Sequence, residues 1–124
     1  MSDRVEQITD WDDAYANVAH IPGGEGFAPR WEGEAEVFRA AHPPEAVGRG
    51  ELYLPAGTPR GLAVFIHGGY WLRFGPRWFS HHAGGALARG WAVLLPGYPL
   101  APEAGLRQMR DAVAAQIDAA AARV

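Results

Sequence analysis

The sequence contains no cysteine among its 124 residues. A disulfide framework and thiolate metal sites are therefore excluded, and the chain suits a reducing compartment. Basic charge is also scarce, because the formal net charge is -3, so we expect no nucleic-acid partner. The motifs HExxH and GxGxxG and a P-loop lysine are missing as well. We accordingly expect no metal and no cofactor.

Long apolar runs are absent too. None approaches the roughly 20 residues that a membrane-spanning helix needs. The opening MSDRVEQITDWDD is polar and acidic, unlike a signal peptide. We therefore expect a cytoplasmic protein that binds no membrane. Hydrophobic residues make up 48% and charged residues 20%, a composition typical of one modest globular domain.

Serine is nearly as scarce as cysteine, since only Ser2 and Ser80 occur. Neither lies in G-x-S-x-G, the strained turn that exposes a nucleophilic serine. Ser80 precedes His81 and His82, but adjacent residues of a helix point away from each other, which makes a poor nucleophile and base pair. The two histidines also lack the i, i+4 spacing of helical zinc ligands. We expect them at surface or partly buried helix positions.

The first 42 residues predict two short helices. Thr9 or Asp10 can cap the first helix, and Pro29 suits the start of the second. Prolines at 43 and 44 end the second helix. The apolar residues that share a face are Trp11, Tyr15 and Val18 in the first helix, and Trp31, Ala35 and Phe38 in the second.

After Gly50 the pattern changes to strands. The segment ELYLP alternates, with Leu52 and Leu54 on one side, whereas LAVFI at 62–66 and WAVLLP at 91–96 are continuous apolar runs. A strand that is apolar on both sides belongs in the middle of a sheet covered by helices. The sequence therefore predicts two buried strands after the first one.

Helical patterns alternate with these strands. One covers 77–89, with Gly90 as its stop, and another covers 103–124. Strands alternating with helices predict an α/β fold, with a mostly parallel sheet and flanking helices, preceded by the helical N-terminal segment. The apolar stripe of the last helix is Leu106, Met109, Val113, Ile117, Ala120 and Val124.

The residues HGGYW, His67 to Trp71, directly follow LAVFI. Ligands collect at the carboxyl ends of strands in an open parallel sheet. Gly68 and Gly69 permit positive φ and a close approach of the backbone to a ligand. Their N–H groups can point at one oxygen and so form an oxyanion hole. The alternative is that the two glycines merely make a tight turn after the strand.

Two motifs make the chain resemble the α/β-hydrolase superfamily, in which HGG follows the third strand and supplies oxyanion donors. The segment YPLAPE, Tyr98 to Glu103, is similar to the Y-x-LAPE element of hormone-sensitive-lipase-like esterases. HGGYW most resembles the kynurenine formamidase (arylformamidase) branch, whose signature is HGG, any residue, then Trp. Lipase-type members usually carry a third glycine where this chain has Tyr70. WDDAYANVAHIPGG is similar to the lead-in of that branch, which lies over the active site.

The resemblance implies roles for individual residues. The backbone amides of Gly68 and Gly69, assisted by that of Tyr70, would stabilise the oxyanion. His67 would brace the loop through a side-chain hydrogen bond and would not be the catalytic base. Tyr70 and Trp71 would wall an aromatic acyl or amide substrate, with simple packing as the alternative.

The serine, acid and histidine of the superfamily are missing, because its fold places the serine after a fifth strand. The resemblance thus implies a partial α/β-hydrolase fold that lacks its C-terminal half, with a lead-in segment at 1–48 and a half-domain at 49–124. The implied activity is hydrolysis of a carboxylic ester or aryl-formamide substrate through a serine absent from this chain. Whether the chain is a truncated product or part of a split enzyme stays open.

The same resemblance places the third strand between the fourth and the fifth. Without the fifth strand, LAVFI would form a bare apolar edge that invites self-association. An alternative function is therefore a non-catalytic α/β module that pairs with a complementary chain through this edge.

Overall fold

The computed structural model describes residues 7–124, in which four strands form one mixed sheet in the order β1-β2-β4-β3. β4 pairs parallel with β3, whereas β2 pairs antiparallel with both β1 and β4. The α/β class is confirmed, but the expectation of a mostly parallel sheet is wrong, because β1 and β2 form a hairpin that reverses the chain. The strands are β1 (Glu45–Val47), β2 (Gly50–Tyr53), β3 (Leu62–Val64) and β4 (Ala92–Leu95).

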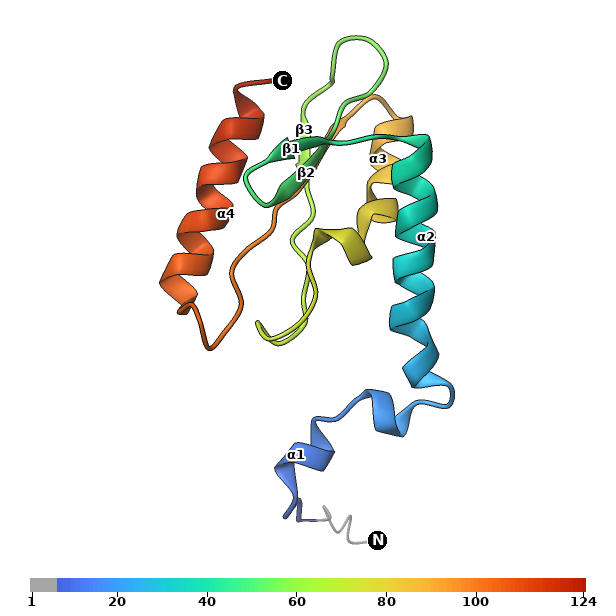
Figure 1. Cartoon of the computed structure of the whole chain (residues 1–124), viewed down its shortest axis with the longest axis vertical. Helices are drawn as coiled ribbons and strands as arrows, with labels where there is room; N and C mark the ends of the chain where they lie inside the picture. Colours follow the sequence, from blue (N-terminus) through green and yellow to red (C-terminus); the bar gives the residue numbers. More distant parts are fainter. Residues whose placement is uncertain (1–6) are drawn as a thin grey trace, which may run out of the picture.

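Helices cover both faces of the sheet (Figure 1). The helix α4 lies on one side, while α2 and α3 lie on the other, and α1 lies near the N-terminal end of the described chain, away from the sheet. Among residues 7–124, no helix has both the length and the apolar character needed to cross a membrane. The α-helices are α1 (Trp11–Ala14), α2 (Phe27–Ala41), α3 (Gly84–Ala88) and α4 (Leu106–Ala121).

The predicted N-terminal helices are confirmed, with small shifts in their bounds. Asp10 caps α1, because its side chain accepts a hydrogen bond of 3.0 Å from the Asp13 amide. The helix α2 begins two residues before Pro29 and ends at Ala41, just ahead of the two prolines. A 3₁₀ turn at Val18–His20 follows α1, so the first helix is shorter than expected.

The continuous helix expected at 77–89 is wrong. The segment consists of two 3₁₀ turns, Pro76–Trp78 and Ser80–Ala83, followed by the short helix α3. Gly84 and Gly85 lie within α3 itself, so the break falls before them, at residues 76–83. Gly90 ends the segment with a φ of +86°, as expected of a glycine after a helix.

Two apolar clusters fill the two sides of the sheet. One joins β1, β2 and β4 to α4, and the other packs β2 and β4 against α2, α3 and the turn between 80 and 83. All four residues of β4 are buried, which confirms that strand. The α4 stripe is buried at Met109 and Ala120, but Leu106 and Val124 at its ends are exposed.

The expectation that LAVFI is buried on both faces is wrong. β3 is only three residues long and lies at the edge of the sheet. The side chains of Val64 and Ile66 are 38% and 53% exposed. The apolar run therefore correctly predicted a strand. Among the described residues, however, no neighbouring strand pairs with its outer side.

β2 also departs from the expected alternation, because all four of its residues are buried and Leu54 is exposed. The Glu51 carboxylate accepts hydrogen bonds from the Tyr53 hydroxyl at 2.5 Å and from Ser80 Oγ at 2.7 Å. Arg39 of α2 donates to Ser80 Oγ at 2.8 Å. Burial, together with the Glu51 hydrogen bond, raises the pKa of Tyr53. Ser80 thus holds α2, β2 and the 80–83 turn together, which suits a structural rather than a nucleophilic serine.

Candidate functional site

The two sequence motifs meet at one end of the sheet. Because β3 and β4 run parallel, the segments that follow them leave the sheet at the same edge. HGGYW follows β3, and YPLAPE follows β4. The Ala101 amide donates to the Trp71 carbonyl at 2.8 Å, which joins the two segments directly. Ligands collect at this edge in α/β sheets.

The two glycines of the loop play different structural parts. Gly69 has a φ of +127°, and a Cβ there would lie 2.6 Å from the Arg73 carbonyl oxygen. The Gly69 carbonyl accepts hydrogen bonds from the Leu72 and Arg73 amides at 3.0 and 3.1 Å. A Cβ on Gly68 would meet nothing within 4 Å. Only Gly69 therefore needs to be glycine for the loop to fold.

The loop amides have no backbone acceptors within the described chain. Those of Gly68, Gly69 and Tyr70 donate to no backbone carbonyl of residues 7–124. Gly68 is exposed and Gly69 is partly exposed. A ligand oxygen could therefore accept from this backbone without displacing an internal hydrogen bond, and the oxyanion assignment stays a prediction.

Backbone strain is concentrated beside these glycines. Tyr70, Trp71 and Phe74 have φ values of +54°, +58° and +71°, in the left-handed region that side chains disfavour. Each such residue costs on the order of 1–3 kcal/mol, and strain of this kind clusters at functional sites. The side chains of Tyr70 and Trp71 are 59% and 54% exposed, so they are not core residues. Their role as substrate walls stays a prediction.

His67 lies beneath the loop with only 4% of its surface exposed. Its Nδ1 donates to the Gly68 carbonyl at 2.7 Å, and the Tyr98 hydroxyl donates to the His67 carbonyl at 2.8 Å. The two rings stack at 4.4 Å between centroids. Nε2 is buried without a partner in the described chain. The hydrogen bonds of His67 link both motifs again, and its role as a brace of the loop stays a prediction.

We predict that acid destabilises the fold through the histidines. Burial lowers the pKa of His67 below its usual value of 6.5, and burial likewise lowers that of His81. The unfolded chain therefore binds more protons, and the free energy of unfolding should be greatest above pH 6.5 and fall as the pH drops below it. Urea denaturation across this range should show a smaller fall for His67→Gln. If the free energy of unfolding of His67→Gln fell with decreasing pH as steeply as that of the unchanged chain, the prediction would be contradicted.

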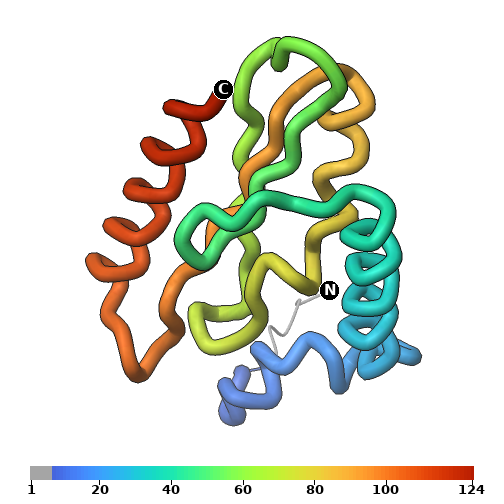
Figure 2. Tube along the Cα trace, turned by 45° about the horizontal axis from the view of Figure 1, so that its top comes forward, coloured from blue at the N-terminus to red at the C-terminus, as the bar shows by residue number. Residues whose placement is uncertain are grey.

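The N-terminal segment contacts the loop. The Tyr70 hydroxyl donates to the Tyr15 carbonyl at 3.3 Å and accepts from Asn17 Nδ2 at 3.5 Å. The blue N-terminal tube accordingly lies close to the loop in Figure 2. The role of this segment as a lead-in over an active site stays a prediction. The boundary at residue 48 stays a prediction.

A groove of about 470 Å³ opens beside the loop at the same edge of the sheet. Gln116 of α4 fixes one wall, because its Oε1 accepts from the Gly97 amide at 2.9 Å and its Nε2 donates to the Gly97 carbonyl at 2.6 Å. The sequence patterns did not indicate a site role for Arg49, which lies in a turn. They did not indicate one for Gln116 either, because it interrupts an apolar stripe. The lining residues are Arg49, Phe74, Gly75, Pro76, Gly97, Tyr98, Pro99, Leu100 and Glu103.

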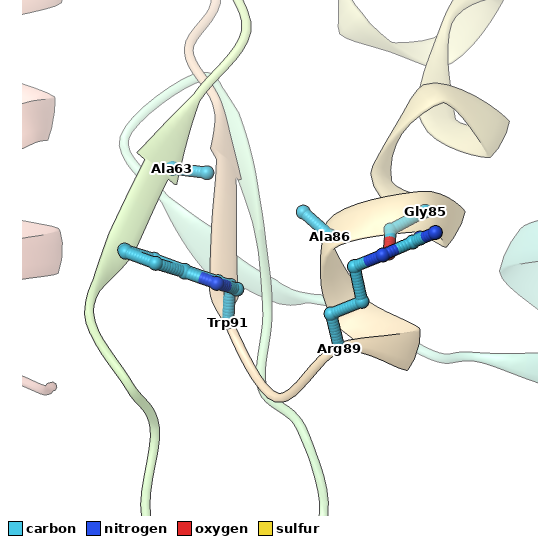
Figure 3. A pocket seen from close by; sticks show the side chains of 5 residues that line it. All are labelled: Ala63, Gly85, Ala86, Arg89 and Trp91. Carbon is cyan, nitrogen blue, oxygen red and sulfur yellow. The ribbon is translucent and has the colours of Figure 1, made fainter.

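A second hollow, of about 370 Å³, lies between β3 and α3 (Figure 3). Its lining is mostly apolar and includes Ala63, Ala86 and Trp91, together with Gly85 and Arg89. Trp91 immediately precedes β4, whereas the loop follows the end of β3. This hollow is therefore separate from the groove beside HGGYW.

Nowhere in residues 7–124 do three potential ligands from His, Cys, Asp and Glu gather. His81 is partly buried, with Nε2 3.4 Å from Glu34 Oε2, and His82 is exposed. Both positions agree with the expectation for this pair.

No protein-family model matches the chain, and no curated protein does. Among solved structures, it is similar to a proposed thioesterase from Silicibacter sp. TM1040, with 42% sequence identity and a TM-score of 0.83. The likeness covers 90% of this chain. It spans 47% of the length of the Silicibacter chain. The two proteins therefore share a fold over nearly all of this chain, and the rest of the Silicibacter protein has no counterpart in it.

Proposed function

We propose that this chain forms part of an α/β hydrolase that cleaves an acyl bond, and that it contributes the oxyanion loop. The observation that carries the proposal is the likeness to the proposed thioesterase from Silicibacter, at 42% identity. The substrate class is a carboxylic ester, a thioester or an aryl-formamide. The serine nucleophile, the acid and the base come from outside this chain.

The topology supports the proposal. β3 lies at the edge next to β4, which is the position that the hydrolase resemblance implies for the third strand before a fifth strand is added. The HGG loop follows this third strand, as in the superfamily. The contact between Ala101 and Trp71 also brings the Y-x-LAPE-like segment against the loop.

The loop would act by electrostatic stabilisation. When a nucleophile attacks an acyl carbon, negative charge develops on the carbonyl oxygen. Preorganised amides 2.7–3.1 Å from that oxygen stabilise the charge, and the loss of one donor typically costs about 2.7–4 kcal/mol. The amides of Gly68, Gly69 and Tyr70 are the proposed donors. Because esters, thioesters and amides pass through the same tetrahedral oxyanion, these donors would serve all three.

A second candidate function is a non-catalytic module that binds a complementary chain. The exposed edge of β3 favours it, because an unpaired apolar strand can accept a strand from a partner. Both candidates place further residues against the outer side of β3. They differ in whether the assembled protein hydrolyses a substrate.

Hydrolysis of p-nitrophenyl acetate distinguishes the two candidates. We expect no turnover by the 124-residue chain above that of its Gly69→Pro variant. Joining the chain to the part of the Silicibacter protein that it does not cover should produce turnover that Gly69→Pro abolishes, because proline removes one loop amide. Equal rates in the joined protein and its Gly69→Pro variant would overturn the oxyanion assignment.

A further inference from the structure

The turn that carries Arg49 is packed closely against the segment after β4. A Cβ on Gly97 would lie 2.6 Å from the Arg49 carbonyl oxygen and 2.9 Å from the Arg49 Cβ. One residue after Arg49, a Cβ on Gly50 would lie 2.6 Å from Gln116 Oε1. Because Gln116 also binds both backbone groups of Gly97, contacts with two other segments fix the backbone of Arg49 beside the groove.

Packing also holds the walls of the groove in place. Tyr98 is buried, and its ring stacks on that of His67 with 4.4 Å between the centroids. The ring centroid of Phe74 lies 5.7 Å from those of both Trp78 and Phe79. The volume of about 470 Å³ is typical of small-molecule sites, which are usually preformed and mostly apolar with a few polar groups. The groove therefore has the size and the firmly held aromatic walls of such a site.

Arg49 brings a positive charge to this groove that the described chain does not neutralise. Within residues 7–124 it forms no ion pair, whereas Arg30, Arg110 and Arg123 each pair with a carboxylate. A guanidinium is always charged and offers a planar fork of donors that matches a carboxylate. Beside apolar walls the attraction between these two groups is stronger than in open water, because the local dielectric constant is lower.

Glu103 lines the groove as well, in the turn before α4. It is exposed, and it forms no ion pair with Arg49. Its negative charge would repel an anion in the groove, whereas Arg49 would attract one. Removal of each charge should therefore change the binding of an anion in opposite directions.

We propose that the groove binds a small organic anion, with Arg49 pairing with its carboxylate and with Phe74 and Tyr98 contacting its apolar part. An aromatic carboxylate meets both requirements, because its ring packs on aromatic walls and its charge pairs with the guanidinium. A neutral amide of the same shape lacks the charge and should bind less well. This inference goes beyond the proposed function, since it requires neither hydrolysis nor the oxyanion assignment.

Titration of the 124-residue chain with phenylacetate, followed by NMR, tests the site. We expect saturable shifts of the Gly97 and Tyr98 amides at low salt, and about 10-fold weaker binding of the neutral phenylacetamide. Arg49→Gln should weaken phenylacetate binding about 10-fold, which corresponds to about 1.4 kcal/mol, and leave phenylacetamide binding unchanged. Arg49→Lys keeps the charge but loses the planar fork, so its affinity should lie between those of Arg49→Gln and the unchanged chain.

Arg30→Gln is the matched control, because it removes a positive charge from α2, which lies on the other side of the sheet from α4 (Figure 1). It should bind phenylacetate as the unchanged chain does. Glu103→Gln should tighten binding about 2-fold, because it removes a repulsive charge from the groove. Unchanged or weaker binding by Glu103→Gln would overturn the assignment of an anion to this groove.

The proposal is also overturned by the absence of saturable shifts, by equal binding of phenylacetate and phenylacetamide, or by equal losses in Arg49→Gln and Arg30→Gln. Phenylacetate binding together with hydrolysis that Gly69→Pro does not reduce would remove the proposed function and keep the groove. Hydrolysis that Gly69→Pro abolishes, without phenylacetate binding, would remove the groove and keep the proposed function.

Discussion

Replacing Gly69 by alanine in the joined protein should lower kcat for p-nitrophenyl acetate by about 100- to 1,000-fold, the usual effect of losing one oxyanion donor. Gly69 has a φ of +127°, and a Cβ there would lie 2.6 Å from the Arg73 carbonyl. The loop must therefore shift, which moves the amides away from the developing negative charge. Steady-state kinetics would measure the change.

Gly68→Ala provides the matched control. It adds the same methyl group one residue earlier, where no atom lies within 4 Å. Because the added methyl group meets no protein atom, the loop backbone keeps its conformation, and we expect a smaller loss of activity than in Gly69→Ala. Equal losses in the two variants would contradict the assigned donors, and thermal melts of both variants would show whether general unfolding contributes to either loss.

Replacing Gln116 by leucine should lower the free energy of unfolding by about 2–4 kcal/mol. Gln116 is buried and pairs with both the amide and the carbonyl of Gly97. Leucine has a similar size but leaves both backbone groups buried without a partner, and each such group costs about 1–3 kcal/mol. Urea denaturation would measure the change.

Gln108→Leu is the control within the same helix. Gln108 accepts a hydrogen bond of 2.8 Å from the Gly105 amide at the exposed start of α4. Water can replace this partner, so the expected loss is only about 0.5–1.5 kcal/mol. If Gln108→Leu were as destabilising as Gln116→Leu, the Gly97 hydrogen bonds would not be the main contribution of Gln116.

The sequence predicted those features that depend on residues close together in the chain. Asp10 caps a helix through its own side chain, and Gly90 ends a segment through its positive φ. The buried strand β4 follows from its continuous apolar run. The HGGYW and YPLAPE motifs were recognised from the sequence, and the structure brings them into contact.

Features that depend on tertiary contacts could not be predicted in this way. β1 has two exposed residues out of three, so its apolar pattern is too weak to indicate a strand. A glutamate such as Glu51 is expected at the surface from the sequence. It is buried because Tyr53 and Ser80 donate hydrogen bonds to its carboxylate. Gln116 interrupts an apolar stripe, and only its contact with Gly97 explains why it is buried.

The strand order has a consequence for biosynthesis. β4 lies between β2 and β3, although it follows both in the chain. The hairpin of β1 and β2 and the separate strand β3 therefore leave the ribosome before the strand that joins them exists. Until residues 92–95 are translated, β3 has no strand to pair with. We expect its apolar residues to be exposed to solvent during that interval, which makes the nascent chain prone to aggregation.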